Sequence, residues 1–257
     1  MANKADKPIV IKVGSSSLTT NKGQLDLANL KKLAAEISQL VKAGQKVVIV
    51  TSGAIASGAQ HLRLGQPKTI AEKQAAAAVG QSRLMRQYEK AFEKYHIPVA
   101  QILLSRDVIT NEERKVNAQN CFATLLKEGV IPIVNENDTV AIEEIKFGDN
   151  DTLAALTAGL IGAHILIILT DVDGFYMKDE KGNSYLVPEI IEIDTKVTAA
   201  AGNSSSNVGT GGMQTKLQAA QICQKAGITM AIIHGRKKGL IKKVLAGEKA
   251  GTVFRPR

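Results

Sequence analysis

The sequence predicts an α/β protein with a mostly parallel sheet that is covered by helices on both faces. Short runs of β-branched residues alternate with longer amphipathic stretches along the 257 residues, a pattern typical of repeated β-α units. The composition, 44% hydrophobic and 22% charged residues, is that of a globular chain rather than a disordered one. A chain of this length buries roughly three quarters of its unfolded surface, so its core needs no disulfide to stabilise it.

Hydrophobic periodicity places the individual elements. The β-branched runs predict six strands, at residues 9–13, 46–51, 98–104, 130–135, 165–170 and 229–233. Apolar residues at helical spacing predict helices over residues 25–43, 71–94, 112–127 and 215–225. Two irregular stretches, 136–150 and 200–212, are predicted to be loops. No proline-rich linker divides the chain, so we expect any two lobes to share one sheet.

The sequence predicts a cytoplasmic protein with neither an export signal nor a membrane span. Residues 1–8 are polar, whereas a secretory signal needs an apolar run after its charged start. Residues 152–170 lack Asp, Glu, Lys and Arg, but glycines divide them into a helical half and a buried strand. Cys121 and Cys223 sit among apolar residues without metal-binding or redox spacing, which predicts reduced thiols in the core.

The net charge of +9 is confined to the C-terminal part of the chain. Residues 216–257 contain ten Lys or Arg and one acid, Glu248, whereas the other residues balance at 23 basic against 23 acidic. Such an excess fits a solvated helix face, an attracted polyphosphate or a nucleic acid. Single-strand binders interleave aromatic residues with basic ones, and Phe254 is the one aromatic residue in this region, so we expect no specific nucleic-acid partner.

Glycine-containing segments follow the first two predicted strands. The first strand leads into Gly14 in KVGSSS (12–17), and the second leads into Gly53 in TSGA (51–54). Ligands of open α/β sheets bind outside the carboxyl ends of the strands, so both segments are predicted to face one crevice. Glycine lets backbone N–H groups approach an anion closely, although an ordinary turn is the alternative interpretation.

A glycine-rich loop, GTGGMQTK (209–216), runs into the last predicted helix. Its glycines permit close backbone approach, the helix N-terminus offers N–H groups, and Lys216 adds a full positive charge. These features indicate a phosphate cradle that is not a Walker loop, since GxxxxGK[ST] does not occur in the chain. A flexible linker before the helix is the alternative.

The segment from 135 to 151 is acidic, with six acids against one lysine, Lys146. Such a segment favours binding of a cation, which could be a substrate ammonium group, Mg²⁺ or a catalytic lysine. The alternative interpretation is an acidic hairpin exposed to solvent. Thr170 and Asp171 end a buried strand and are candidates for a nucleotide contact, although the following Asp-Gly pair is also turn chemistry. The four histidines lie far apart, so we expect no metal site made by protein side chains alone.

Together these segments resemble the amino acid kinase family, over about residues 9 to 254. The motifs that carry the resemblance are KVGSSSL (12–18), VTSGAIASG (50–58), AAVGQSRL (77–84), VNENDTVAIEEIKFGDND (134–151) and SNVGTGGMQTKLQAA (206–220). The last two are the most specific. The resemblance is strongest to the branch of the family that uses ATP and Mg²⁺ to phosphorylate the γ-carboxylate of L-glutamate, giving L-glutamyl 5-phosphate at the start of proline biosynthesis.

The resemblance implies a three-layer αβα sandwich with two lobes. The N-terminal lobe, here about residues 8–165, is expected to bind the acceptor, and the C-terminal lobe, about residues 166–257, is expected to bind the nucleotide. Many members carry a further C-terminal PUA domain, and because the sequence stops at Arg257 we expect a short form without it.

The matched motifs also imply the site residues. Lys12 and Lys216 are expected to flank the transferring phosphoryl group, with Asp151 holding the two lysines apart and aligned. The residues expected to bind glutamate are Ser52, Gly53, Asp138 and Asn150. The residues expected to contact ATP are Lys12, Gly14, Thr170, Asp171, Thr210, Gly211, Gly212, Met213, Gln214, Thr215 and Lys216. Mg²⁺ is expected to bridge the ATP phosphates.

The acidic segment agrees with a glutamate acceptor, because glutamate has a free ammonium group, acetylglutamate has none, and uridylate brings a phosphate. Two alternatives stay open: a kinase of this family with another acceptor, and a non-catalytic ligand sensor or basic nucleic-acid binder. The resemblance further implies feedback inhibition by proline and a homo-oligomer, either a dimer or a tetramer.

Overall fold

The computed structural model describes residues 6–20, 24–105, 107–140, 150–202 and 212–256. The elements follow the chain in the order β1 (Ile9–Val13), α1 (Ser15–Leu18), α2 (Leu27–Lys42), β2 (Val47–Thr51), α3 (Ala54–Leu62), α4 (Ile70–Glu93), β3 (Val99–Leu104), α5 (Asp107–Thr110), α6 (Glu112–Lys127), β4 (Ile131–Glu136), α8 (Asn150–Leu160), β5 (Ile165–Thr170), β6 (Tyr176–Lys178), β7 (Ser184–Leu186), β8 (Glu189–Ile190), α9 (Thr195–Gly202), α10 (Met213–Lys225), β9 (Thr229–His234), α11 (Leu240–Leu245) and β10 (Thr252–Phe254).

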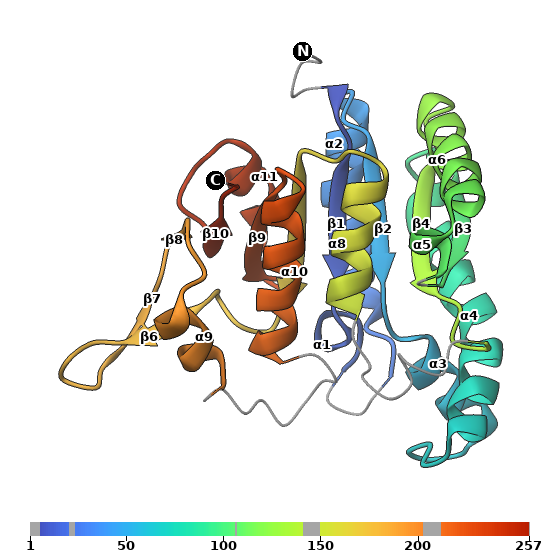
Figure 1. Cartoon of the computed structure of the whole chain (residues 1–257). Helices are drawn as coiled ribbons and strands as arrows, with labels where there is room; N and C mark the ends of the chain where they lie inside the picture. The colour runs from blue at the N-terminus through green and yellow to red at the C-terminus, as the bar shows by residue number, and fades with distance from the viewer. Residues whose placement is uncertain (1–5, 21–23, 106, 141–149, 203–211, 257) are drawn as a thin grey trace.

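One sheet runs through the molecule. Its strand order is β3-β4-β2-β1-β5-β9-β10-β8, and each pairing described within it is parallel except that of β9 with β10. The strands β6 and β7 form a separate antiparallel pair. The mostly parallel sheet predicted from the sequence is therefore confirmed. Because β1 to β5 and β9 are parallel, their carboxyl ends meet at one edge, the lower edge in Figure 1.

Helices cover both faces of this sheet and make three layers. Successive strand residues point to opposite faces, so Ile9 and Ile11 pack in one core cluster with α2, α4 and α11. Val10 packs in the other cluster with α6, α8 and α10. Figure 1 shows α8 and α10 in front of the sheet. The αβα sandwich implied by the resemblance is confirmed.

The predicted elements are present with small shifts at their ends. All six predicted strands occur, as β1 to β5 and β9, and all four predicted helices occur, as α2, α4, α6 and α10. The loop predicted for 136–150 is wrong at both ends, because Glu136 pairs with Leu104 as the last residue of β4 and Asn150 begins α8. Residues 200–202 are likewise the end of α9 rather than loop. Residues 141–149 and 203–211 lie outside the described residues.

The cysteine prediction is half wrong. Cys223 is buried in α10, and burial raises the pKa of its thiol to about 12. Cys121 is exposed on α6, because its neighbour Phe122 takes the inward-facing position of that helix. Among the described residues, no helix is both long and apolar enough to cross a membrane.

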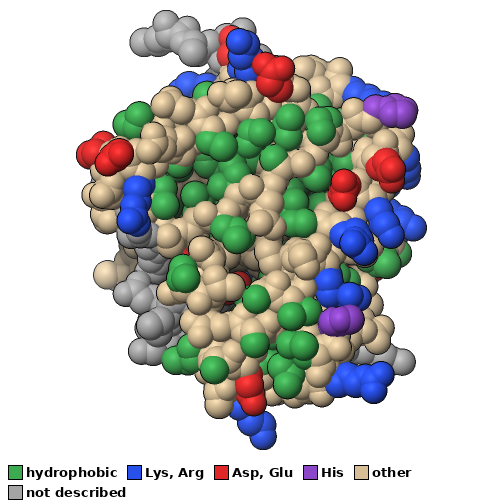
Figure 2. Space-filling view, turned by 90° about the vertical axis from the view of Figure 1, so that its right-hand side faces the viewer, with side chains coloured by type: hydrophobic (Ala, Val, Ile, Leu, Met, Phe, Trp, Pro, Cys, Tyr) green, Lys and Arg blue, Asp and Glu red, His purple; other side chains and the backbone are tan. Residues whose placement is uncertain are grey.

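The strand β3 forms one edge of the sheet. Figure 2 looks at this side of the molecule and shows hydrophobic side chains gathered on it. Leu103 of β3 and Val116 of α6 are 36% and 48% exposed.

Candidate active site

Two lysines from distant parts of the chain meet on one buried carboxylate at the carboxyl edge of the sheet. Lys12 Nζ lies 2.7 Å from Asp151 Oδ1, and Lys216 Nζ lies 3.1 Å from Asp151 Oδ2. The Asp151 side chain is fully buried, and the side chains of the two lysines are 8% and 7% exposed. The structure thus brings together the three residues that the motifs single out, with Asp151 between the two ammonium groups.

Asp151 is ionised at neutral pH in spite of its burial. Burial raises the pKa of a carboxyl group, but the charges and hydrogen bonds of Lys12 and Lys216 outweigh that effect and hold the pKa of Asp151 well below its ordinary value. Asp151 also stands in the first turn of α8, where the helix dipole favours a carboxylate. The three side chains together carry two positive charges and one negative, a balance that favours an anion close by.

Strand and helix geometry explain why these side chains converge. Val10 of β1 packs in the core under α8, and Lys12, two residues further on, points to the same face at the end of the strand. Asp151 is the second residue of α8 and Lys216 the fourth of α10. Because α8 and α10 both cover this face and both begin at the carboxyl edge, their first turns meet above Lys12.

Gly14 directly follows β1 and lies against β5. Its N–H donates to Leu169 O at 3.1 Å, and a Cβ at this position would lie 3.0 Å from that oxygen and 3.7 Å from Lys12 Nζ. A side chain here would therefore crowd the Leu169 carbonyl oxygen, whereas its distance to the ammonium group would be an ordinary contact. Thr170, which ends β5, is buried and donates to Asp171 Oδ1 at 3.0 Å, whereas Asp171 itself is exposed.

The structure describes only the last part of the predicted phosphate cradle, residues 212–216 of the glycine-rich loop 209–216. Thr210 and Gly211 lie outside the described residues. Gly212 is the N-cap of α10 and makes no side-chain cap, and a Cβ there would meet nothing within 4 Å. Among the described residues, nothing therefore crowds the N-terminal end of α10 at Gly212.

The first turn of α10 presents its side chains in different directions. Met213 packs against the core, and Gln214 is exposed. The Thr215 hydroxyl lies 3.0 Å from Asp151 Oδ2 and 2.8 Å from Gly212 O, so it ties this turn to α8. Of these three predicted nucleotide contacts, Thr215 is the one that reaches the lysine pair.

A second polar cluster surrounds Asn150. Its Nδ2 donates to Thr51 O at 2.6 Å, to Asn135 Oδ1 at 2.9 Å and to Ser52 Oγ at 3.2 Å. Gly53, which follows Ser52, is the N-cap of α3 at a φ of 99°, a left-handed conformation that favours glycine. The structure thus brings Ser52, Gly53 and Asn150 together, as the motifs imply.

Sequence reasoning missed Asn135 and Gln81 as members of this cluster. Asn135 Nδ2 donates to Gln81 Oε1 at 2.9 Å, and Gln81 Nε2 donates to Gln101 Oε1 at 3.0 Å. For Asn135 a signal existed, because it shares a face of β4 with the buried Ile131 and Ile133 and stands near the carboxyl end. A polar residue that ends a buried alternation at this edge is a candidate site residue.

Asp138 follows β4, and none of the described hydrogen bonds joins it to Ser52 or Asn150. Burial, and after it the charge of Glu136, raises the pKa of Asp138 to about 6. Glu136 is 4% exposed, and its Oε2 has no hydrogen-bond partner among the described residues. Two neighbouring carboxyl groups with little solvent favour a cation between or beside them.

The two clusters are joined by consecutive residues. Asn150 contacts the Ser52 and Asn135 side chains, and Asp151 holds the lysines. The first turn of α8 therefore sets the position of both clusters at once. In the described part of the chain, no group of three or more His, Cys, Asp or Glu side chains is placed to hold a metal ion.

Comparison with known proteins agrees with this arrangement. Residues 7–234 match the amino acid kinase family. The chain belongs to that family. The matched range contains Lys12, Asp151 and Lys216 as well as both polar clusters.

Individual relatives in the family match the chain along nearly its whole length. It is 48% identical over 256 residues to the glutamate 5-kinase of Geobacter metallireducens, a match that spans 98% of this chain and 69% of that protein. It is also 48% identical over 252 residues to the glutamate 5-kinase of Clostridium acetobutylicum, spanning 97% of this chain and 94% of that protein. Among solved structures, carbamate kinase from Giardia lamblia bound to AMP-PNP matches with a TM-score of 0.69 at 20% identity, covering 99% of this chain and 100% of that one. That likeness shows a shared fold.

Proposed function

We propose that the chain transfers the terminal phosphoryl group of ATP to the γ-carboxylate of L-glutamate, giving L-glutamyl 5-phosphate at the first step of proline biosynthesis. The observation that carries the proposal is the junction in α8, where Asn150 belongs to the polar cluster and Asp151 aligns Lys12 with Lys216. Identity of 48% to relatives named glutamate 5-kinase supports glutamate as the acceptor.

The lysine pair suits phosphoryl transfer because that reaction needs positioning and charge neutralisation rather than covalent help. Lys12 and Lys216 contact the two oxygens of one carboxylate, so their two positive charges lie close enough to neutralise one shared anion. A carboxyl group with an ordinary pKa near about 4.3 is already ionised at pH 7, so the attacking γ-carboxylate needs no general base.

We assign acceptor binding to Ser52, Gly53, Asn150 and Asp138. Ser52 and Asn150 offer a hydroxyl and an amide for the acceptor, and the left-handed Gly53 places the start of α3 beside them. The Asp138 carboxyl, with Glu136 next to it, is suited to the ammonium group of glutamate, because a bound cation relieves the repulsion between the two carboxylates. An acceptor without an ammonium group would leave that repulsion in place.

We assign nucleotide binding to Gly14, Thr170, Asp171 and the end of the glycine-rich loop from 210 to 216. The N-terminal end of α10, with its backbone N–H groups, and Lys216 suit the ATP phosphates. This division places the acceptor in a lobe of about residues 8–165 and the nucleotide in a lobe of about 166–257. Mg²⁺, which neutralises phosphate charge, fits here as an ion carried by ATP, because the described residues provide no cluster of ligands for it.

Three expectations accompany the proposal. We expect proline to inhibit as the end product, assembly as a homodimer or homotetramer, and a location in the cytoplasm. The exposed apolar side chains beside the edge strand β3, such as Leu103 and Val116, support assembly, since monomers rarely expose large apolar patches. Light scattering and a proline titration of the activity test the first two.

The acceptor assignment is tested by trapping the acyl phosphate with hydroxylamine after incubation with MgATP. Glutamate should give a hydroxamate, whereas acetylglutamate, aspartate, carbamate and uridylate should give none or release no ADP above background. Turnover with another acceptor and none with glutamate would contradict the assignment of glutamate as the acceptor, but the chain would still be a kinase. Absence of ADP release with every acceptor would favour a non-catalytic sensor instead.

A further inference from the structure

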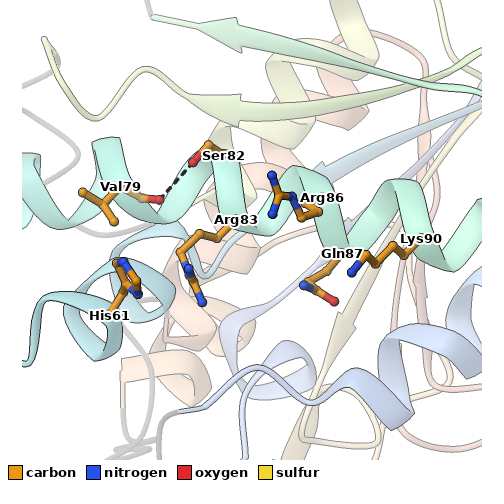
Figure 3. A pocket seen from close by; sticks show the side chains of 7 residues that line it. All are labelled: His61, Val79, Ser82, Arg83, Arg86, Gln87 and Lys90. Carbon is orange, nitrogen blue, oxygen red and sulfur yellow. Dashed lines mark hydrogen bonds between the residues drawn. The ribbon is translucent and has the colours of Figure 1, made fainter.

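A separate group of basic side chains lines hollows between α3 and α4. One hollow, of about 460 Å³, is lined by His61 of α3 and by Val79, Ser82, Arg83, Arg86, Gln87 and Lys90 of α4 (Figure 3). Two smaller hollows adjoin it, because Arg83 lines all three, and Arg63 lines one of them. The three hollows therefore form one depression centred on Arg83.

The charge around this depression is positive, and none of the described residues supplies a counterion to it. Of the described residues that line the three hollows, none is Asp or Glu. Within the described part of the chain, no hydrogen bond or ion pair holds the charged groups of Arg83, Arg86 and Lys90. By contrast, Arg236 and Arg255 each pair with a carboxylate.

The spacing of these residues creates repulsion that a bound anion would relieve. Arg83, Arg86 and Lys90 stand three and four residues apart on one helix, where like charges are neighbours and each pair costs about 0.2–0.5 kcal/mol. Figure 3 shows Arg83, Gln87 and Lys90 extending from α4 on the side where His61 projects from α3. Arg83, Gln87 and Lys90 of α4 thus face His61 of α3 across the depression, whereas Arg86, which also lines it, is turned to the other side of α4 in this view.

The walls of the depression are held in fixed positions. A Cβ at Gly58 of α3 would lie 1.7 Å from Ala76 O, and a Cβ at Gly80 of α4 would lie 1.8 Å from Ala54 O. The two helices are therefore in backbone contact, one turn away from Arg83. A rigid wall lowers the cost of ordering a ligand.

We propose that this depression binds a small phosphorylated ligand through Arg83, Arg86 and Lys90. A guanidinium group matches phosphate oxygens with two parallel N–H donors, and three positive charges on one face match a ligand with two or more negative charges better than a monocarboxylate. The volume is in the range of small-molecule sites. The inference concerns a site outside the polar clusters and does not rest on the acceptor assignment.

The test is calorimetric titration of the full chain with pyrophosphate, with a non-hydrolysable ATP analogue and constant free Mg²⁺ present to fill the nucleotide site. The test variant is Arg83→Gln/Arg86→Gln. The matched control is Lys31→Gln/Lys32→Gln, which removes two charges from the exposed face of α2. The wild type and the control should bind pyrophosphate, and the test variant should bind it at least tenfold more weakly with unchanged basal turnover.

Equal affinity in all three proteins would overturn the proposal, as would an equal response to KCl or acetate at matched ionic strength. Tighter binding of citrate than of pyrophosphate would overturn the phosphoryl assignment. If pyrophosphate does not bind and the test variant changes the mass measured by light scattering, the basic patch is a contact between chains and the proposal is wrong.

Discussion

Lys12 and Asp151 form an ion pair at 2.7 Å in which both side chains are almost completely buried. One side chain comes from the sheet and the other from α8, so the pair exists when the helix has docked on the sheet. The charge that aligns the lysines is thus a product of tertiary packing.

Replacing Lys216 should stop the reaction without unfolding the chain. We expect Lys216→Met to lower kcat by about 10² or more, because a positive charge beside the transferring phosphoryl group acts mainly in the transition state. Asp151 keeps Lys12 as a partner, so the fold should persist. Steady-state kinetics and a melting curve measure both effects, with Lys225→Met at the exposed end of α10 as the control. Normal turnover in a folded Lys216→Met protein would remove Lys216 from the site.

Asp138 should impose an acid limb on glutamate use. With its pKa raised to about 6, the carboxyl loses its charge as the pH falls through 6, and kcat/KM for glutamate should then drop toward tenfold per pH unit. Asp138→Asn should lower kcat/KM at pH 8, chiefly through KM for glutamate, and should abolish the bend near pH 6. If Asp138→Asn raised the KM for ATP as much as the KM for glutamate, Asp138 would not belong to the acceptor site.

The raised pKa of Asp138 also means that its ionised form destabilises the folded chain at neutral pH. The folded-state pKa of Asp138 lies above the ordinary value of 3.8, so the folded state binds the proton more tightly and loses stability as the pH rises from about 4 through about 6. Asp138→Asn should therefore melt higher than the wild type at pH 7.5, and by less at pH 5. A lower melting temperature at pH 7.5 would contradict the burial of this carboxylate.

The contact between α3 and α4 should tolerate no added methyl group. Gly80→Ala forces a Cβ into Ala54 O and should cost about 1–3 kcal/mol or more of unfolding free energy. The control is Gly159→Ala in α8, where a Cβ meets nothing within 4 Å and the change should gain roughly 0.5–1 kcal/mol through helix propensity. Urea unfolding measures the free energy of unfolding of both variants. Equal changes in the two variants would mean that α3 and α4 can move apart to accept the added methyl group.

The basic C-terminal part should bind RNA weakly and without sequence preference. Four of its ten basic residues already pair with carboxylates: Lys216, Arg236, Lys237 and Arg255. The remaining charge can neutralise phosphates but, with Phe254 as the one aromatic residue, provides no stacking platform. Filter binding across a salt series should show steep loss of affinity. Tight, sequence-selective binding at physiological salt would refute this.

The parts that the sequence predicted well are those where one pattern dominates. The β-branched runs identified six of the eight strands of the main sheet, and the residues at their carboxyl ends, such as Gly14 and Ser52, did gather at one edge. Short elements without their own periodicity, such as α1 and β8, were missed because tertiary contacts rather than local preference hold them.

Site residues were harder to predict where a side chain acts through another. Gln81 lies in the middle of a long helix, and its role depends on a hydrogen bond to Asn135 that joins elements far apart in the sequence. No local pattern contains that information. Asp138 illustrates the converse, since its chemistry was expected from the motif while its raised pKa follows from burial beside Glu136.

The register of β1 has a consequence for the fidelity of folding. Lys12 stands opposite Val50 of β2 and Ile168 of β5. A slip by a single position would turn its ammonium group to the opposite face, among the apolar side chains under α2 and away from Asp151. Burial of an ammonium group among apolar side chains raises the free energy of the misaligned pairing. The lysine that we assign to phosphoryl transfer therefore also favours the correct register of β1.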